Sequence, residues 1–436
     1  MADEWKEYVN DPRTVCKYAS KCYQKNPEHH QKYKHPPENT RKYVNRNNRR
    51  FSPYTRGSPR HSPNPRSKDE SHSANDEEKA VNDESDIKIE TDDTLTETPT
   101  KETNEANTKE SKHELTIELP ENITFYGKST DNSIFKELFL VEMPEDFFKF
   151  YECINDTGKS VEDTLASVNL MPIGPYDLLL GKMPKLDNKE LYLIHWRFFY
   201  DPPEFQAILK KKRNSEYHIG YFRDAPDRKP VFLASNDSEK DYHITPMAEN
   251  IFGAVYMYLQ NEKKHSPFTA MSCQKLMDTI KVYAEKNNIS LEEFSMKKRS
   301  PHIVTRSFHG AGIVVPYDKK TQLGYRRLVE TDANLKKLFA SLEKATNQND
   351  KDKILSKLQP VITYASIAVD ESDFGTGLEV GVALFCSGLK ELEPSAMSSL
   401  VAAYTVLNRT SFADIIKAHL KYRRKGPNVS LLHLKK

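Results

Sequence analysis

The chain has 436 residues, enough for one large domain or two to three domains of about 100–200 residues each. Lysine and arginine total 65 and aspartate and glutamate total 63, so the formal net charge is only +2. No apolar stretch approaches the ~20 residues of a membrane span, and the first residues lack the basic and then apolar character of a secretory signal. Together with only five cysteines, these features exclude a membrane protein and a disulfide-stapled secreted domain, and they indicate a reducing compartment.

The first predicted element is a zinc site near the N-terminus. Cys16, Cys22, His29 and His35 form a Cys-x5-Cys-x6-His-x5-His pattern. Zinc prefers four nitrogen or sulfur ligands in a tetrahedron, and a segment this short and polar has no other means of folding. Four protein ligands leave no open position for water, so we expect a structural zinc finger over 11–37. The alternative is accidental clustering in a disordered tail.

The side chains around these ligands resemble the poly(ADP-ribose)-binding zinc finger family. A basic residue stands three before the first cysteine (Arg13), an aromatic residue two after it (Tyr18), and a tyrosine directly after the second cysteine (Tyr23). The resemblance implies that the aromatic rings stack on adenine and that the basic group holds pyrophosphate. Ala19 replaces the family's usual glycine and Gln24 its usual arginine, so we expect zinc binding to survive and affinity for the polymer to be reduced.

Charge is strongly asymmetric over the next part of the chain. Residues 1–68 carry 16 Lys/Arg against 6 Asp/Glu, a balance of +10, whereas residues 69–114 carry 5 Lys against 16 Asp/Glu, a balance of −11. Neither the basic part, residues 38–68, nor the acidic part, residues 69–114, could bury enough apolar area to offset the conformational entropy that ordering the chain would cost. We therefore predict a disordered linker over 38–114, basic and then acidic.

Two features of this linker leave its role open. Ser-Pro pairs at Ser52, Ser58 and Ser62 could accept phosphate. The arginine-rich half could contact nucleic acid, serve as a nuclear-import signal, or act only as a flexible tether.

From about residue 115 the sequence predicts a folded α+β body. Residues 115–119 alternate apolar and polar, and helical spacing follows over 134–151, with Ser133 as the expected N-cap and Pro144 dividing the segment into two helices. Short apolar runs bounded by turn residues predict strands, at 191–199, 217–222 and 231–234.

After residue 246 the pattern becomes mainly helical. Apolar residues recur at three- and four-residue steps in six segments: 247–260, 269–287, 331–345, 351–369, 395–407 and 410–422. We expect a small mixed or antiparallel sheet in 115–245, followed by a mainly helical part over 246–436.

The strongest candidate site in the body is a group of carboxylates. An apolar helical run ends abruptly at Asp370, Glu371 and Asp373, and two glycines and a second apolar run follow. Clustered carboxylates at the end of a helix repel one another and face the negative end of the helix dipole. Because this placement is locally unfavourable, a functional site or a binding partner is one explanation, and the alternative is an ordinary solvated surface.

Two other segments are weaker candidates. Phe222 and Arg223 stand at the end of a predicted strand, and the pattern alone favours an edge-strand arginine paired with Asp224 or Asp227. The glycine-containing turn at 307–316 lacks the spacing of a known phosphate-binding loop, and its His309 fits a packed histidine better than a catalyst.

Taken together, these segments resemble the histone PARylation factor 1 family. The resemblance is carried by five stretches: 201–206, 220–224, 308–312, 324–326 and 370–379. It implies an accessory factor that docks on a DNA-damage-activated poly(ADP-ribose) polymerase and completes the active site of that enzyme. Glu371 matches the family's catalytic glutamate, Asp370 a docking residue, and Phe222 and Arg223 the joint interface, with Asp373 and Asp224 as further acidic candidates.

The resemblance also implies the setting in which such a factor acts. Zinc would be the structural cofactor of the finger, NAD would be bound by the partner enzyme, and histones and poly(ADP-ribose) would be further partners, in the nucleus on damaged chromatin. No membrane partner is expected, and direct binding to DNA stays open. The competing hypotheses are a poly(ADP-ribose)-reading scaffold without a catalytic contribution and a hydrolase that removes ADP-ribose.

Overall fold

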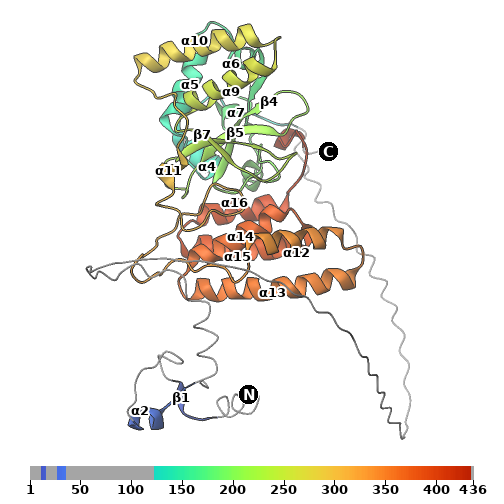
Figure 1. Cartoon of the computed structure of the whole chain (residues 1–436). Coiled ribbons are helices and arrows are strands. Elements are labelled where there is room, and N and C mark those ends of the chain that lie inside the picture. Colours follow the sequence, from blue (N-terminus) through green and yellow to red (C-terminus); the bar gives the residue numbers. More distant parts are fainter. Residues whose placement is uncertain (1–10, 16–26, 36–121, 434–436) are drawn as a thin grey trace, which may run out of the picture. The chain divides into compact units, whose positions relative to one another are not determined.

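A computed structural model describes residues 11–15, 27–35 and 122–433 of the chain (Figure 1). The chain divides into two units, Met1–Asn104 and Glu105–Lys436. Within the described ranges, none of the helices combines the length and apolar character that crossing a membrane requires.

Several sequence predictions lie outside the described residues. They are the linker over 38–114, the phosphate-accepting Ser52, Ser58 and Ser62, and the alternating segment 115–119. These remain predictions.

In the first unit, two short strands and a helix lie in the described residues 11–15 and 27–35. Strand β1 (Thr14–Val15) pairs in parallel with strand β2 (Tyr33–Lys34), and helix α2 (Pro27–Lys32) precedes β2. Proline at the first position of α2 is favourable, because its fixed φ suits a helix and its missing N–H would have no helical partner there. The strand pairing brings Thr14 and Val15, which precede Cys16, beside Tyr33 and Lys34, which precede His35.

In the described part of the second unit, hereafter the body, the first two helices lie on either side of Pro144. Helix α4 spans Asn132–Phe139 and helix α5 spans Glu145–Asn155, so the prediction of two helices divided by Pro144 is confirmed. The predicted N-cap is wrong by two positions: Asp131 caps α4, and its side chain accepts the N–H of Ser133. Three short helices follow: α6 (Val161–Ala166), α7 (Tyr176–Leu179) and α8 (Glu190–Leu193).

A five-stranded sheet forms the middle of the body, in the order β3-β4-β5-β6-β7 with every neighbouring pair antiparallel. Its strands are β3 (Leu170–Pro172), β4 (Phe205–Lys211), β5 (Tyr217–Phe222), β6 (Phe232–Asp237) and β7 (Thr245–Ala248). The antiparallel sheet and the strand at 217–222 are confirmed, and the run at 231–234 is the first part of β6.

The strand predicted over 191–199 is wrong. The chain forms helix α8 at 190–193 and then turns, with Trp196 at a φ of 56°. All residues of this run are buried. A run that is buried on every side shows no periodicity, so sequence alone does not distinguish a strand from a short helix and turns.

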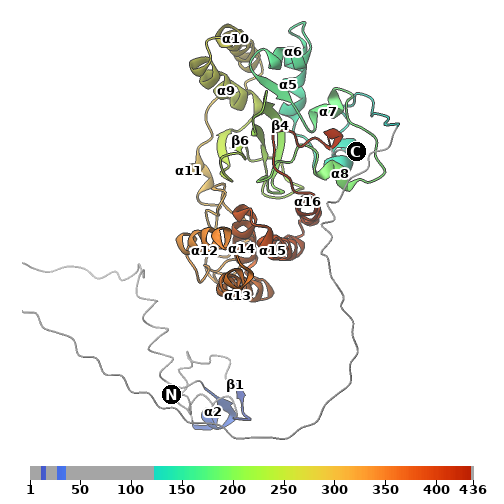
Figure 2. The same ribbon diagram turned by 90° about the vertical axis from the view of Figure 1, so that its right-hand side faces the viewer.

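Helices cover both sides of the sheet. Figures 1 and 2 show α9 (Ile251–His265) and α10 (Ala270–Lys286) on one side, and a bundle of later helices on the other. The short helix α11 (Met296–Arg299) lies between these two groups along the chain. The bundle consists of α12 (Asp332–Lys344), α13 (Gln348–Asp370), α14 (Phe374–Ser387), α15 (Glu393–Val406) and α16 (Thr410–Lys421), with single 3₁₀ turns at Lys390–Leu392 and Leu431–His433.

The predicted helical half is confirmed, but α14 was not among the predicted helices. Residues 375–386 of this helix are all buried, so it has no polar face to reveal its period. Glycines let the neighbouring helices approach it closely: a Cβ on Gly377 would lie 2.3 Å from a methyl of Val369, and one on Gly381 would lie 2.7 Å from Leu400. Helix α14 is thus the centre of the bundle, with α13 and α15 packed against it.

Candidate catalytic carboxylate site

The turn between α13 and α14 carries the three predicted carboxylates. The N–H of Ser372 donates to the carbonyl of Val369 (3.0 Å), and the N–H of Asp373 donates to that of Ala368 (2.7 Å). This pair of bonds is a Schellman motif, and Ser372 occupies its left-handed position with a φ of 71°. Glu371 is the capping residue of α13, so its backbone is fixed by the end of one helix and the start of the next.

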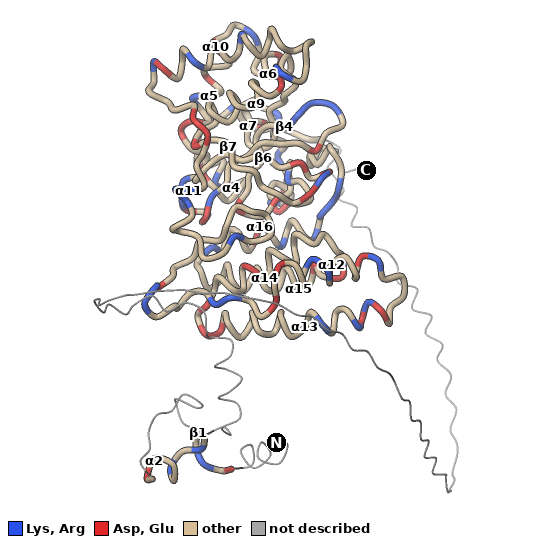
Figure 3. The backbone as a smooth tube through the Cα atoms, in the orientation of Figure 1, with Lys and Arg blue, Asp and Glu red and all other residues tan. Residues whose placement is uncertain are grey.

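These carboxylates differ in exposure. Asp370 is exposed, the Glu371 side chain is 57% exposed, and the Asp373 side chain is only 9% exposed. Figure 3 shows acidic residues at this end of α13. Glu371 therefore faces solvent and is not sealed inside its own fold.

Arg326, from the segment before α12, lies between two of the carboxylates. Its Nε donates to Oδ2 of Asp373 at 2.5 Å, and its Nη2 forms an ion pair with Oε2 of Glu371. The guanidinium carbon is 5.9 Å from the centroid of the Tyr364 ring on α13. Arg326 was not among the predicted site residues, because it is 45 residues from Glu371 and nothing local marks it as a partner.

The backbone around Arg326 is joined to the first turn of α14. The N–H of Gly324 donates to Oδ1 of Asp373 (2.9 Å), and the N–H of Gly375 donates to the carbonyl of Gly324 (2.9 Å). Thr376 accepts the N–H of Arg326 at 3.0 Å and donates its hydroxyl to the carbonyl of the same residue at 2.6 Å. Gly324 has a φ of 110°, and a Cβ there would lie 2.1 Å from a backbone oxygen, so only glycine fits.

A fourth carboxylate of this stretch, Glu379, is an internal hydrogen-bonding group. It accepts the hydroxyls of Thr305 (2.7 Å) and Tyr325 (3.1 Å), and burial raises the pKa of its carboxyl. It ties α14 to two separate loops and has no open face for a partner.

Arg223 is buried at the end of the sheet. It follows β5, which pairs with strands on both sides, and its side chain donates to the carbonyl of Glu142 (3.0 Å). Burial lowers the pKa of its guanidinium to about 10. Asp224 instead pairs with Arg299, at 2.6 and 2.9 Å. The interpretation of Arg223 as an edge-strand residue paired with Asp224 or Asp227 is therefore wrong.

Phe222 is also buried, 1% exposed, and stacks on Phe232 with ring centroids 4.9 Å apart. No hydrogen bond or ion pair among the described residues joins Phe222–Asp224 to the carboxylate turn. A partner could reach the Phe222 and Arg223 side chains only if this packing changed. Their place at a joint interface stays a prediction.

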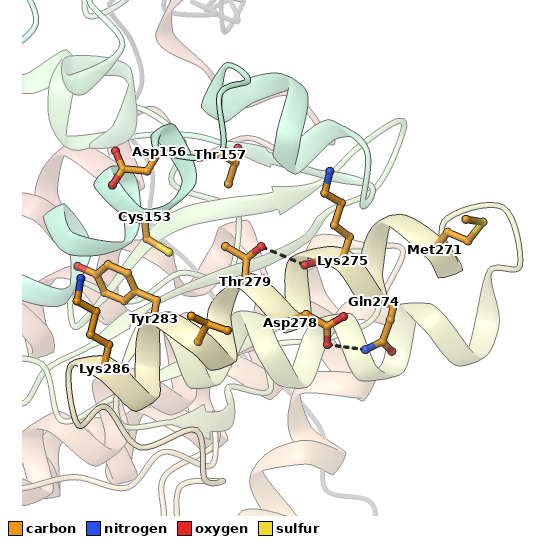
Figure 4. A pocket seen from close by; sticks show the side chains of 11 residues that line it. Cys153, Asp156, Thr157, Met271, Gln274, Lys275, Asp278, Thr279, Tyr283 and Lys286 are labelled. Carbon is orange, nitrogen blue, oxygen red and sulfur yellow. Dashed lines mark hydrogen bonds between the residues drawn. The ribbon is translucent and has the colours of Figure 1, made fainter.

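A pocket of about 850 Å³ lies along α10, on the opposite side of the sheet from α13 (Figures 1 and 4). Its lining includes Cys153, Gln274 and Asp278, and the Gln274 amide donates to Asp278 within the helix at 2.7 Å. Burial raises the pKa of the Cys153 thiol to about 11, which makes it a weak nucleophile at neutral pH. None of the predicted site residues lines this pocket.

In the first unit, the described part of the predicted finger fits zinc. The Nε2 atoms of His29 and His35 lie 3.2 Å apart, close to the separation of about 3.3 Å expected for two nitrogens bound at ~2.0–2.1 Å to one tetrahedral zinc. Cys16 and Cys22 lie outside the described residues. Among the residues that are described, His, Cys, Asp and Glu form no group of three or more that could hold a metal.

Arg13 is the one predicted polymer contact that the structure describes. Its side chain is 45% exposed, pairs with Asp11, and also donates to the carbonyl of His30 at 2.5 Å. These bonds place it beside the helix that carries His29, the first of the two predicted histidine ligands. Tyr18 and Tyr23 lie outside the described residues, so the stacking role of these two stays a prediction.

Comparison with known proteins covers both units. The sequence model of the family described as histone PARylation factor 1 matches residues 130–423, and that of the PBZ domain matches residues 13–38. Histone PARylation factor 1 of Danio rerio is 38% identical over 294 residues, covering 66% of this chain and 84% of the relative. The protein of the same name from Bos taurus is 39% identical over 298 residues, covering 65% and 84%. A human protein named putative histone PARylation factor 1-like is 37% identical over 299 residues, covering 66% and 85%.

Both resemblances seen in the sequence are therefore confirmed. This chain belongs to the histone PARylation factor 1 family and carries a PBZ zinc finger domain near its N-terminus.

Proposed function

We propose that this chain is an accessory factor of a poly(ADP-ribose) polymerase, and that it lends Glu371 to the polymerase as a general base for serine ADP-ribosylation of histones. The name of its relatives, histone PARylation factor 1, supports a role in this modification. The observation that carries the proposal is the exposed Glu371 carboxylate, which stands on a rigid turn between two helices. A base with this placement can enter the cleft of a second protein.

The chemistry explains why a second protein would supply the base. A serine hydroxyl is a poor nucleophile near neutral pH and must lose its proton as its oxygen attacks C1″ of the ADP-ribosyl group of NAD. The new C–O bond forms as the bond to nicotinamide breaks, and Glu371 takes the serine proton. General-base help of this kind contributes about 10²–10⁴-fold to a rate. NAD itself would be bound by the polymerase.

Asp370 is proposed to contribute to docking. It is exposed and adjoins Glu371, so it would attract a basic surface or a basic residue next to the acceptor serine. Reversal of its charge, Asp370→Lys, is expected to weaken capture of the polymerase in a pull-down.

The finger is proposed to bring the factor to poly(ADP-ribose) on damaged chromatin in the nucleus. Cys16, Cys22, His29 and His35 would hold a structural zinc, which supplies folding energy and no reaction step. Arg13, Tyr18 and Tyr23 would contact the polymer. The Cys16→Ala variant should release zinc and lose polymer binding. Polymer binding that persists in this variant at moderate salt would assign the interaction to the arginines of the linker.

The decisive test is a histone modification assay with polymerase and NAD, in which hydroxylamine-resistant product reports serine linkage. Glu371→Gln should abolish this product while the complex with the polymerase still forms. Glu343→Gln, at an exposed glutamate of α12, is the matched control and should behave as the native chain. Serine transfer retained by Glu371→Gln would remove Glu371 from the role of base and favour a poly(ADP-ribose)-reading scaffold. Removal of ADP-ribose from modified histone without polymerase would instead indicate a hydrolase.

A further inference from the structure

We propose that a second copy of this chain docks along the exposed face of α10, with the two α10 helices antiparallel to each other. The inference goes beyond the proposed function and does not depend on it. It rests on four side chains that line the pocket along α10, hereafter the α10 seam: Met271, Lys275, Asp278 and Val282.

Exposed apolar side chains mark this face of α10 as an interaction surface. Met271 is 88% exposed and Val282 is 66% exposed, and Phe268, which lies just before the helix, is 100% exposed. The other face of α10 is buried in the body, through residues that include Leu276 and Ile280. A single exposed apolar residue needs no explanation, but several of them beside a large groove indicate that another protein surface covers them.

The α10 seam has the spacing at which two helices pack against each other. Its four residues follow one another at steps of four, three and four positions, so they form one row along the helix. All four are exposed. The apolar residues stand at the two ends of the row, and Lys275 and Asp278 stand in the middle. Read in the opposite direction, the row has the opposite charge at each middle position, so it is complementary to its own reverse.

This order of charges selects an antiparallel pair of helices. In that arrangement Lys275 of each copy faces Asp278 of the other copy, and Met271 of each copy faces Val282 of the other. A parallel pair would place lysine against lysine and aspartate against aspartate, which is repulsive. The antiparallel pair also gives both copies the same set of contacts, as a twofold symmetric interface requires.

Both charged groups are available for contacts between copies. Lys275 and Asp278 are three positions apart on one helix, a spacing that permits an ion pair, yet Figure 4 shows no bond between them. Oδ1 of Asp278 accepts the Gln274 amide at 2.7 Å. Neither Lys275 nor Asp278 forms an ion pair with any residue in the part of the chain that the structure describes.

The groove beside the α10 seam offers a second helix a place to lie. Cys153, Asp156 and Thr157, at the end of α5, bound it on the side away from α10 (Figure 4). Its volume of about 850 Å³ is enough to receive several side chains of a second copy. The face lies on the opposite side of the sheet from α13 (Figure 1). The carboxylate turn therefore stays open in the dimer, and each copy can still dock a polymerase.

The experiment is sedimentation equilibrium of the full chain over a wide range of concentrations. The native chain should approach twice the mass of one chain as the concentration rises. Interfaces of ordinary size have dissociation constants in the micromolar range or below, so a chain that remains monomeric at about 100 μM overturns the inference.

Reversal of single charges tests the α10 seam. Lys275→Asp places two aspartates against each other at both ends of the charged region, and Asp278→Lys does the same with two lysines. Each variant should raise the dissociation constant of the dimer at least tenfold. Lys297→Asp, at an exposed lysine of α11, is the matched control and should leave the dissociation constant unchanged. Thermal melting of each variant reports folding, and these positions are exposed.

Exchange of the two charges tests the antiparallel arrangement. The double variant Lys275→Asp with Asp278→Lys restores an attractive pair at each position, so its dissociation constant should return to within a few-fold of the native value. Single variants that dimerise as tightly as the native chain would show that the α10 seam is not the interface. If both single variants weaken the dimer but the double variant stays as weak as they are, the antiparallel pairing is wrong and the inference is overturned.

A parallel assay separates this inference from the proposed function. Lys275→Asp should retain native serine transfer in the histone assay, because the α10 seam lies on the opposite side of the sheet from Glu371. If the chain is monomeric while Glu371→Gln abolishes serine transfer, the dimer is refuted and the proposed function stands. If the dimer forms as described while Glu371→Gln is fully active, the proposed function is refuted and the dimer stands.

Discussion

His309 makes the stability of the body sensitive to mildly acidic pH. The side chain is 2% exposed, and its Nδ1 accepts the N–H of Ala311 at 3.2 Å, so this nitrogen must carry a lone pair and no proton. Burial lowers the pKa of His309 to about 3, and the nearby Arg299 and His243 act in the same direction. The folded protein therefore holds a neutral imidazole over a range in which the unfolded chain binds a proton.

The sign and size of the effect follow from this difference in pKa. An unfolded histidine titrates near pH 6.5, so protons favour the unfolded state as the pH falls below that value, and the effect grows until the folded group titrates near pH 3. Between pH 8 and pH 5 this linkage removes about 2 kcal/mol from the free energy of unfolding.

The assay is urea unfolding of the full chain at pH 8, 7, 6 and 5, comparing the native protein with His309→Asn. The Asn Oδ1 can occupy the place of Nδ1 and accept the Ala311 N–H, so the variant removes the titrating group and keeps the acceptor. The variant should lose about 2 kcal/mol less than the native protein between pH 8 and pH 5. His419, whose pKa is also lowered by burial, titrates in both proteins and cancels in the comparison.

A lower stability of His309→Asn at pH 8 would reflect only the smaller side chain and leaves the comparison intact. If the two proteins show the same loss between pH 8 and pH 5, His309 is not held neutral and the reasoning is refuted.

Two further predictions concern stability near the candidate residues. Ser372→Gly removes the strain of a left-handed serine (φ 71°), so the free energy of unfolding should rise by up to about 1 kcal/mol, and an unchanged or lower melting temperature would contradict this. Asp224→Asn leaves the Arg299 guanidinium, 3% exposed, without its carboxylate, so unfolding should become easier by about 2–4 kcal/mol. Asp227→Asn is the control for the second variant, and equal losses in the two would show that the pair with Arg299 is not the cause.

The sequence predicted well those elements that have one face in solvent. Helices α10, α12, α13, α15 and α16 begin and end within a few residues of their predicted bounds, because each alternates buried and exposed positions at the period of a helix. The strand at 217–222 is buried over most of its length and was still predicted with its observed bounds, because turn residues bound the run. Family membership and the PBZ finger were indicated by the resemblance of individual motifs to those of the two families, and the comparisons confirm both.

Only the tertiary structure decided the remaining features. Helix α14 and the run at 191–199 are buried on every side, so their sequences contain no polar face from which a period could be read. The buried state of Arg223 and the pairing of Asp224 with Arg299 depend on which segments pack against the end of the sheet.

The candidate site likewise has one part that the sequence shows and one part that only the structure shows. The three carboxylates of the turn form a local pattern, acidic residues at the end of a helix, and this pattern is visible in the sequence. The ion pair between Arg326 and Glu371 is not visible in the sequence. Arg326 lies 45 residues before Glu371 and reaches it only because its loop packs on α14. An ion pair of this kind is fixed by the distances between folded segments, and no local sequence pattern specifies those distances.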